Sequence, residues 1–138
     1  MVGLVLVGHS PRLLDGLREM LAQAAPAVPV ATAGGTSAGA LGTSAPLVLQ
    51  ALRDVLGHCD GDGAVILVDL GSAALAVEVA LEDATDQERR LVRLCDGPIV
   101  EGAVIAAVEA ASGAGLDAVL RAADGATGSG KWPDDLAR

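Results

Sequence analysis

The sequence predicts one α/β domain with a doubly wound, mainly parallel sheet and helices on both faces. Four predicted strands alternate with helical segments, which is the element order of a parallel sheet with crossover helices. The first and third strands are continuous apolar runs, as is typical of strands buried on both faces, whereas the fourth is more exposed at its start. The 138 residues suit a single domain, and the 51% hydrophobic content is enough for a full core.

The opening residues indicate the first strand and the first helix. Residues 2–8 read VGLVLVG, which is a buried strand bounded by Gly8. Pro11 suits the first turn of a helix, where its missing N–H does no harm. A helical pattern then runs from Pro11 to about Ala25. We expect its apolar stripe to contain Leu13, Leu14, Leu17, Met20 and Leu21.

The second strand is expected over residues 28–35, where the sequence is VPVATAGG. Residues 34–44 are small and polar and suit neither a strand nor a helix interior. A helix is expected from about 45 to 56, because Ser44 is a plausible N-cap and Pro46 falls in the first turn.

The second half of the chain repeats the strand–helix alternation. A third buried strand is expected over 64–73, closing in Asp-Leu-Gly-Ser, and a helix then runs to about Asp83. A fourth strand is expected over 89–95. Two helices follow, over 99–112 and over 115–123. The domain is therefore expected to span 1–123, with 124–138 as a flexible tail.

The composition excludes several classes of function. The formal net charge is −9, and the chain has no Phe or Tyr and one Trp. An acidic chain without aromatic platforms has little affinity for phosphate backbones or bases, so we expect no nucleic-acid partner. No apolar run reaches the length of a membrane span, and no basic segment precedes the first apolar run. The cysteines, Cys59 and Cys95, do not form a disulfide framework, so we expect a cytoplasmic protein without membrane association.

The candidate site lies where three predicted strands end. His9 follows the first strand, the segment 34–43 follows the second and Asp69 closes the third. In sheets of this kind, sites form outside the carboxyl ends of the strands. The structural alternative is that His9 only caps the following helix or bonds to the backbone.

A histidine, a carboxylate and a helix N-terminus together suit a phosphoryl carrier. Neutral imidazole is a nucleophile near neutral pH, and a carboxylate that accepts Nδ1–H would leave the Nε2 lone pair free. Helix N–H groups could then receive the phosphoryl oxygens. A serine hydrolase using Ser10 or Ser72 is disfavoured, since the chain has no G-x-S-x-G elbow. We expect no metal site, because His58 and the two cysteines lack ligand spacing.

Four ordered segments carry a resemblance to a known family. They read LVLVGHSPRLLDGL, GGT…LGTSA, VDLGSAALAVEVAL and GPIVEGAVIAAVEAASG, and they span about residues 2–123. Together they resemble the phosphotransfer subunit of phosphoenolpyruvate-dependent dihydroxyacetone kinase, in the mannose-type enzyme IIA family of the phosphotransferase system. The last 15 residues, with Trp132, match no part of this pattern.

The resemblance implies a fold, a site and partners. It implies the strand order 2-1-3-4, with His9 as the phosphorylated residue and Asp69 as its orienting carboxylate. It implies that loops around the histidine contact the phosphoryl group or the partner, through Ser10, Gly34, Gly35, Thr36, Gly42, Thr43, Gly71 and Ser72. It further implies HPr as the donor, ADP held in the nucleotide-binding kinase subunit as the acceptor, a third subunit that binds dihydroxyacetone, and a homodimer. Some relatives carry fused HPr and enzyme I-like domains, whereas here we expect a separate donor. No cofactor is expected.

Three alternatives remain open at this point. The chain could feed a mannose-family sugar permease IIB domain instead of a kinase. Phosphorylated His9 could instead report the state of the phosphotransferase system to a regulator. The chain could also be an inert doubly wound domain in which His9 is only a helix cap.

Overall fold

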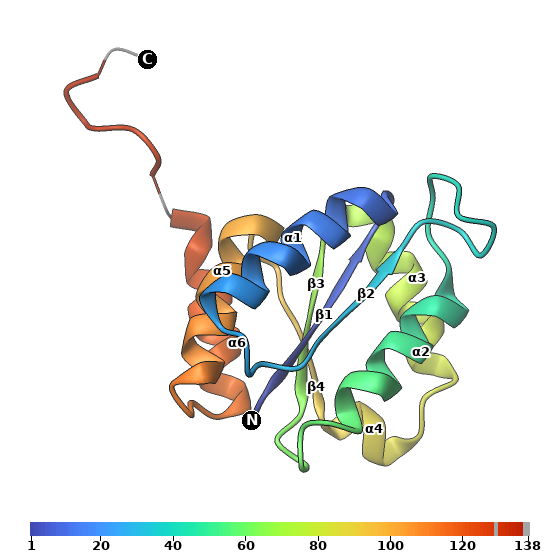
Figure 1. Ribbon diagram of the computed structural model, residues 1–138. Coiled ribbons are helices and arrows are strands. Elements are labelled where there is room, and N and C mark those ends of the chain that lie inside the picture. The colour runs from blue at the N-terminus through green and yellow to red at the C-terminus, as the bar shows by residue number, and fades with distance from the viewer. Residues whose placement is uncertain (129, 137–138) are drawn as a thin grey trace.

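The computed structural model describes residues 1–128 and 130–136, and residues 1–128 form a sheet flanked by two layers of helices (Figure 1). The strands are β1 (Gly3–Gly8), β2 (Val30–Gly34), β3 (Ala64–Val68) and β4 (Val92–Leu94). The helices are α1 (Pro11–Ala24), α2 (Ala45–Leu56), α3 (Gly71–Glu82), α4 (Asp86–Arg90), α5 (Ile99–Ala111) and α6 (Leu116–Gly125), followed by the 3₁₀ turn η1 (Ala126–Gly128). The predicted α/β class is confirmed.

The sheet has the order β2-β1-β3-β4, and each neighbouring pair is parallel. The strand order implied by the family resemblance is therefore confirmed. Val7 of β1 is in register with Val68 of β3, so the residues that follow these two strands emerge side by side. This register is what brings His9 close to Asp69, although the two residues are far apart in the sequence.

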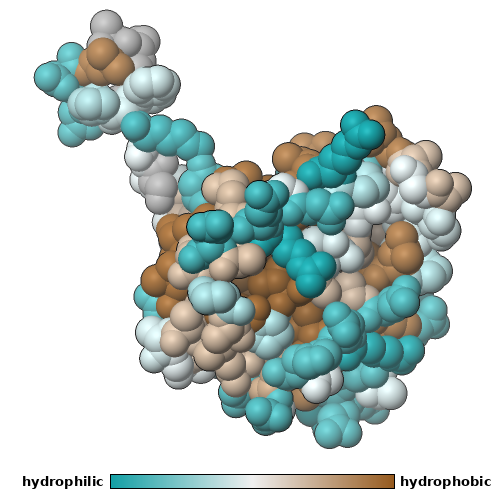
Figure 2. Space-filling view, in the orientation of Figure 1, coloured by the Kyte–Doolittle hydropathy of each residue, from teal (hydrophilic) through white to brown (hydrophobic). Residues whose placement is uncertain are grey.

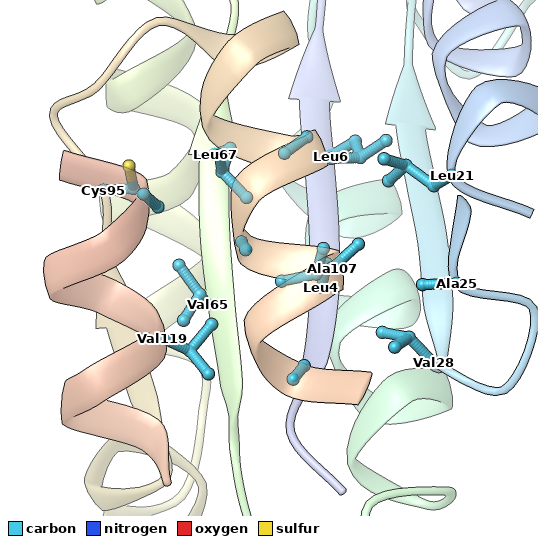
Figure 3. Packing of buried hydrophobic residues seen from close by; sticks show 14 of the residues in the cluster. Leu4, Leu6, Leu21, Ala25, Val28, Val65, Leu67, Cys95, Ala107 and Val119 are labelled. Atoms are coloured by element: carbon cyan, nitrogen blue, oxygen red, sulfur yellow. The ribbon is translucent and has the colours of Figure 1, made fainter. Parts of the chain in front are cut away.

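The core has two halves, one on each face of the sheet. Alternate residues of β1 point to opposite faces: Leu4 and Leu6 pack in one cluster, whereas Val5 and Val7 pack in the other. The first cluster joins the sheet to α1, α5 and α6 (Figure 3), and the second joins it to α2 and α3. Because both faces are covered, β1 is buried along its whole length and provides a rigid base for the residues that follow it.

The largest departure from the sequence prediction lies before β4. The strand expected over 89–95 is wrong in its first part, since α4 occupies Asp86–Arg90 and β4 begins only at Val92. The cause is a capping box that starts a helix: the Glu88 N–H donates to the Thr85 side chain, and the Thr85 N–H donates to the Glu88 carboxylate.

Other element boundaries shift by a few residues. The strand expected over 64–73 ends at Val68, and Gly71 already begins α3. The strand expected from residue 28 begins at Val30. In α1 the buried residues are Leu14, Leu17 and Leu21. Leu13 and Met20, which were also expected in the apolar stripe, are each 51% exposed, so the expected stripe was too wide.

The C-terminal helix extends into the segment that was expected to be a tail. Helix α6 runs to Gly125, and η1 follows it to Gly128, so residues 124–128 are ordered helical structure. Gly97 explains the close fit of this region, since a Cβ at that position would lie 2.4 Å from the Ala123 carbonyl oxygen of α6. Across the described residues, every helix is too short or too polar to cross a membrane.

Candidate functional site

His9 is held by Asp69 through both its backbone and its ring. The His9 N–H donates to Asp69 Oδ2 at 2.9 Å, and His9 Nδ1 lies 3.1 Å from each carboxylate oxygen. The Asp69 side chain is only 10% exposed, whereas that of His9 is 31% exposed. The carboxylate is therefore held in a fixed position below the ring, and the imidazole lies between it and solvent.

Asp69 is itself stabilised as an anion. Burial raises the pKa of the Asp69 carboxyl, but hydrogen bonds from the His9 N–H, the His9 ring and the Leu70 N–H together lower it below its ordinary value. The bond from the Leu70 N–H to Oδ1 is 2.7 Å long. Asp69 is thus ionised at neutral pH and acts only as a hydrogen-bond acceptor.

This contact fixes the tautomer of His9. A carboxylate can only accept, so the hydrogen of the neutral ring is on Nδ1 and the lone pair is on Nε2. The Ser72 hydroxyl lies 3.0 Å from Nε2 and therefore donates to that lone pair. The ring is oriented from both sides, and its nucleophilic nitrogen points away from Asp69 and toward the start of α3.

The N-terminus of α3 is open beside Nε2. Its N-cap residue, Leu70, provides no side-chain acceptor, and the first two residues of the helix, Gly71 and Ser72, are exposed. Early N–H groups of a helix carry partial positive charge and bind anions. A phosphoryl group on Nε2 would therefore lie against these N–H groups and the Ser72 hydroxyl.

The helix that directly follows His9 is built differently. Ser10 is its N-cap, and the Ser10 side chain accepts a bond of 3.3 Å from the Leu13 N–H. This side chain is therefore committed to α1. From the sequence, the helix after His9 was expected to provide the anion-binding N–H groups, but the Ser72 hydroxyl bonds to Nε2 and turns it toward α3.

The loop between β2 and α2 reaches the histidine through its backbone. The Gly42 N–H donates to the His9 carbonyl at 3.0 Å, and the Gly35 N–H donates to the Gly8 carbonyl at 3.1 Å. Gly35 has φ of 78° and Gly42 has φ of 140°, a region of backbone space that favours glycine. Of the predicted loop residues, Gly35 and Gly42 thus support the segment that carries His9.

Thr36 and Thr43 have a less direct relation to His9 than the two glycines have. Thr36 closes a turn inside the loop, accepting from the Ala40 N–H at 3.2 Å through its side chain and donating its own N–H to the Ala40 carbonyl at 2.9 Å. Thr43 is half-buried, and within residues 1–128 and 130–136 its hydroxyl forms no hydrogen bond with His9. Within the same residues, no group of three His, Cys, Asp or Glu side chains could hold a metal ion.

Sequence reasoning missed the role of Gly8. A Cβ at this position would lie 2.8 Å from Asp69 Oδ2 and 2.9 Å from Asp69 Cγ, so only glycine lets the carboxylate sit against the strand end. The signal that could have found it is a glycine directly before a candidate histidine at the end of a buried strand.

The side chain of His9 is 31% exposed at the carboxyl edge of the sheet. Grooves run along β2 and between α2 and α3, and His9 lines none of them. The other histidine, His58, is bonded through Nδ1 to the Asp54 carbonyl at 2.8 Å, at the far end of α2.

Comparisons with known proteins show what this chain is similar to. A family model described as the PTS system fructose IIA component matches residues 3–120. The phosphoryl donor subunit DhaM of PEP-dependent dihydroxyacetone kinase from Escherichia coli is 39% identical over 87% of this chain, and the chain spans only 26% of that relative. The corresponding subunit of dihydroxyacetone kinase 2 from Listeria innocua is 34% identical, with 88% of this chain and 95% of the relative covered.

A solved structure shows the same fold along nearly the whole chain. The crystal structure of EF1359, a protein of unknown function, matches with a TM-score of 0.83 and 32% identity, and it covers 96% of this chain and 98% of that chain. The family model covers most of the chain, and the Listeria innocua relative matches along nearly its whole length. The chain belongs to the family of PTS system fructose IIA components, in which its relatives include DhaM subunits.

Proposed function

We propose that this protein is the phosphoryl carrier of a phosphoenolpyruvate-dependent dihydroxyacetone kinase, with His9 as the residue that is phosphorylated. The single observation that carries the proposal is the orientation of the ring: Asp69 holds Nδ1, while Nε2 faces Ser72 at the open end of α3. The names of the relatives support the choice of a kinase over a sugar permease, because they are phosphoryl donor subunits of dihydroxyacetone kinases.

In the first step His9 accepts a phosphoryl group from phosphorylated HPr. The Nε2 lone pair forms a bond to phosphorus, and the bond between phosphorus and the donor histidine breaks with its electron pair returning to the donor. The Ser72 hydroxyl leaves Nε2 and donates to a phosphoryl oxygen. The ring of His9 then carries positive charge while Nδ1 keeps its hydrogen, and the Asp69 carboxylate stabilises that charge.

In the second step the phosphoryl group passes to ADP held in the nucleotide-binding subunit of the kinase. An oxygen of the β-phosphate forms the new bond to phosphorus, the bond to Nε2 breaks, and its electron pair returns to the ring. The 31% exposure of the His9 side chain supports an acceptor presented by another protein. A further subunit that holds dihydroxyacetone and a homodimer of this chain complete the proposed assembly.

The proposed phosphorylation site is tested by labelling. Incubation with phosphoenolpyruvate, enzyme I and HPr is expected to add one acid-labile phosphate per chain. The variant His9→Ala should add none, because the nucleophile is gone. The matched control His58→Ala should label like the parent, since His58 lies on the far side of the molecule. Labelling that persists in His9→Ala would contradict the assignment.

The proposed acceptor is tested by discharge. Phosphorylated protein is mixed with ADP-loaded kinase subunit, with a permease IIB domain or with free ADP. We expect loss of label only with the kinase subunit, together with an equal amount of ATP. Discharge to the IIB domain alone would assign the chain to a permease, and discharge to none of the three would support the reporter alternative.

A further inference from the structure

The backbone of His9 is held at both of its polar groups. The His9 N–H donates to Asp69 Oδ2 at 2.9 Å, and the His9 carbonyl accepts from the Gly42 N–H at 3.0 Å. One residue earlier, the Gly8 carbonyl accepts from the Gly35 N–H at 3.1 Å. These bonds fix the direction in which the His9 side chain leaves the backbone. The fit of the ring to Asp69 therefore depends on the shape of the loop between β2 and α2.

The outer part of this loop is not anchored in the core. Residues 37–41 are all exposed, and the loop stands out beyond the ends of β2 and α2 (Figure 1). This part of the surface, in the upper right of Figure 2, is mostly pale to tan, as expected for mostly small side chains. A segment without buried apolar contacts is among the least stable parts of a fold. Hydrogen bonds within the loop must therefore maintain its shape.

Thr36 takes part in the hydrogen bonds that close the loop. The Thr36 N–H donates to the Ala40 carbonyl at 2.9 Å, and the Thr36 side-chain oxygen accepts from the Ala40 N–H at 3.2 Å. The Thr36 carbonyl accepts from the Gly39 N–H at 2.9 Å. Each of these three bonds uses an atom of Thr36. Ala40 is thus held at both backbone groups, and a single residue separates it from Gly42.

The methyl group of Thr36 also supports Gly42. A Cβ built on Gly42 would lie 2.8 Å from Thr36 Cγ2, so the methyl group packs on the side of Gly42 where a side chain would stand. Gly42 has φ of 140°, and in this conformation its N–H reaches the His9 carbonyl. Within residues 1–128 and 130–136, Thr36 forms no hydrogen bond with the His9 side chain. Its influence on the ring therefore passes through Gly42.

We infer that Thr36 is a positioning residue for phosphoryl transfer, which acts on His9 through the turn and the Gly42 N–H. The inference rests on the proposed function. It assigns Thr36 a role that needs no contact with the phosphoryl group or with a partner. When the turn loosens, the His9 carbonyl is released and the ring can rotate away from Asp69. The hydrogen is then no longer confined to Nδ1, and Nε2 is less often the free nucleophile.

The test separates the side-chain oxygen of Thr36 from its shape. Thr36→Val keeps the shape but removes the oxygen that accepts from the Ala40 N–H, whereas Thr36→Ser keeps that oxygen. Thr32→Val is the matched control, since Thr32 is a half-buried threonine of β2 outside the turn. Each variant is labelled by phosphorylated HPr or by phosphoramidate, a small donor that needs no docking. Circular dichroism and thermal melting establish that each variant is folded.

With phosphorylated HPr we expect Thr36→Val to lower kcat about tenfold and to leave KM within about twofold of the parent, because one positioning hydrogen bond is lost. The rate of labelling by phosphoramidate should fall by the same factor. Thr36→Ser and Thr32→Val should stay within about twofold of the parent with both donors. Ring ¹⁵N shifts of the unphosphorylated protein should show the hydrogen on Nδ1 in the parent and a tautomer mixture in Thr36→Val.

Several results would overturn the inference. Slowing of Thr36→Val with HPr alone would show that the loop contacts the donor instead of positioning the ring. A parent rate in Thr36→Val, even with a lower melting temperature, would show that the turn only stabilises the fold. Thr36→Ser as slow as Thr36→Val would exclude the side-chain oxygen as the positioning group. If neither donor labels the parent at His9, the proposed function fails, whereas the ring ¹⁵N shifts still decide whether Thr36 positions His9.

Discussion

The replacement Asp69→Asn tests how the histidine is made nucleophilic. Asp69 accepts from the His9 N–H at 2.9 Å, from the ring at 3.1 Å and from the Leu70 N–H at 2.7 Å. An amide has one oxygen and one NH₂ group, so it cannot accept all three bonds. If the NH₂ group faces Nδ1, the ring hydrogen moves to Nε2 and the nucleophilic lone pair is lost.

The expected loss follows from related catalytic carboxylates. Removing the orienting aspartate of a Ser-His-Asp triad slows the reaction by about 10⁴, and we expect about 10²–10⁴ here for Asp69→Asn and for Asp69→Ala. At 1.36 kcal/mol per tenfold, this equals about 2.7–5.4 kcal/mol of transition-state stabilisation. The carboxylate is nearly buried and faces the ring directly, so solvent screening reduces the effect little.

The assay is the single-turnover rate of label transfer from saturating phosphorylated HPr. Circular dichroism and thermal melting establish that the variants are folded. Ring ¹⁵N chemical shifts should show the hydrogen on Nδ1 in the parent and a changed tautomer mixture in Asp69→Asn. If either Asp69 variant folds normally and transfers at the parent rate, the orienting role of the carboxylate is wrong.

Three further predictions follow from the same geometry. Gly8→Ala should slow transfer by about a hundredfold, because its Cβ displaces the Asp69 carboxylate, whereas Gly16→Ala, whose Cβ meets nothing within 4 Å, should keep the parent rate. Cys59 and Cys95 should react with a thiol reagent at pH 8 only after unfolding, because both side chains are buried. Burial also raises the pKa of both thiols, that of Cys95 to about 11. Rapid reaction of the folded protein would contradict this. Because the pKa of Asp69 is lowered in the folded state, its stabilising contribution is present above the ordinary value of 3.8 and is lost as the pH falls below it. Urea titrations should therefore show the parent and Asp69→Asn converging in unfolding free energy at acid pH, and a gap that widens on acidification would refute the assignment.

The fold could be predicted from the sequence because the two central strands, β1 and β3, are continuous apolar runs, each followed by a clear break. Gly8 and Pro11 mark the first break, and Ser44 with Pro46 marks the start of α2. The prediction failed over residues 89–91, which were expected to begin the fourth strand, because α4 runs to Arg90 and β4 begins only at Val92. There the Thr85–Glu88 capping box starts a helix, and this local signal outweighs the strand-like pattern of the residues that follow.

The site could be predicted from the sequence only in part. His9 and Asp69 could be placed at one edge, because parallel strands end at the same edge of a sheet. Which helix N-terminus faces Nε2 depends on the side from which Asp69 holds the ring, and no local pattern encodes that choice.

In the proposed mechanism Asp69 orients His9 so that Nε2 is the atom that carries the phosphoryl group. The most direct measurement is NMR of ¹⁵N-histidine-labelled protein after phosphorylation by phosphoenolpyruvate, enzyme I and HPr. We expect a ³¹P–¹⁵N coupling to Nε2 of His9, with the hydrogen retained on Nδ1. Coupling to Nδ1, or phosphorus on any residue other than His9, would contradict it.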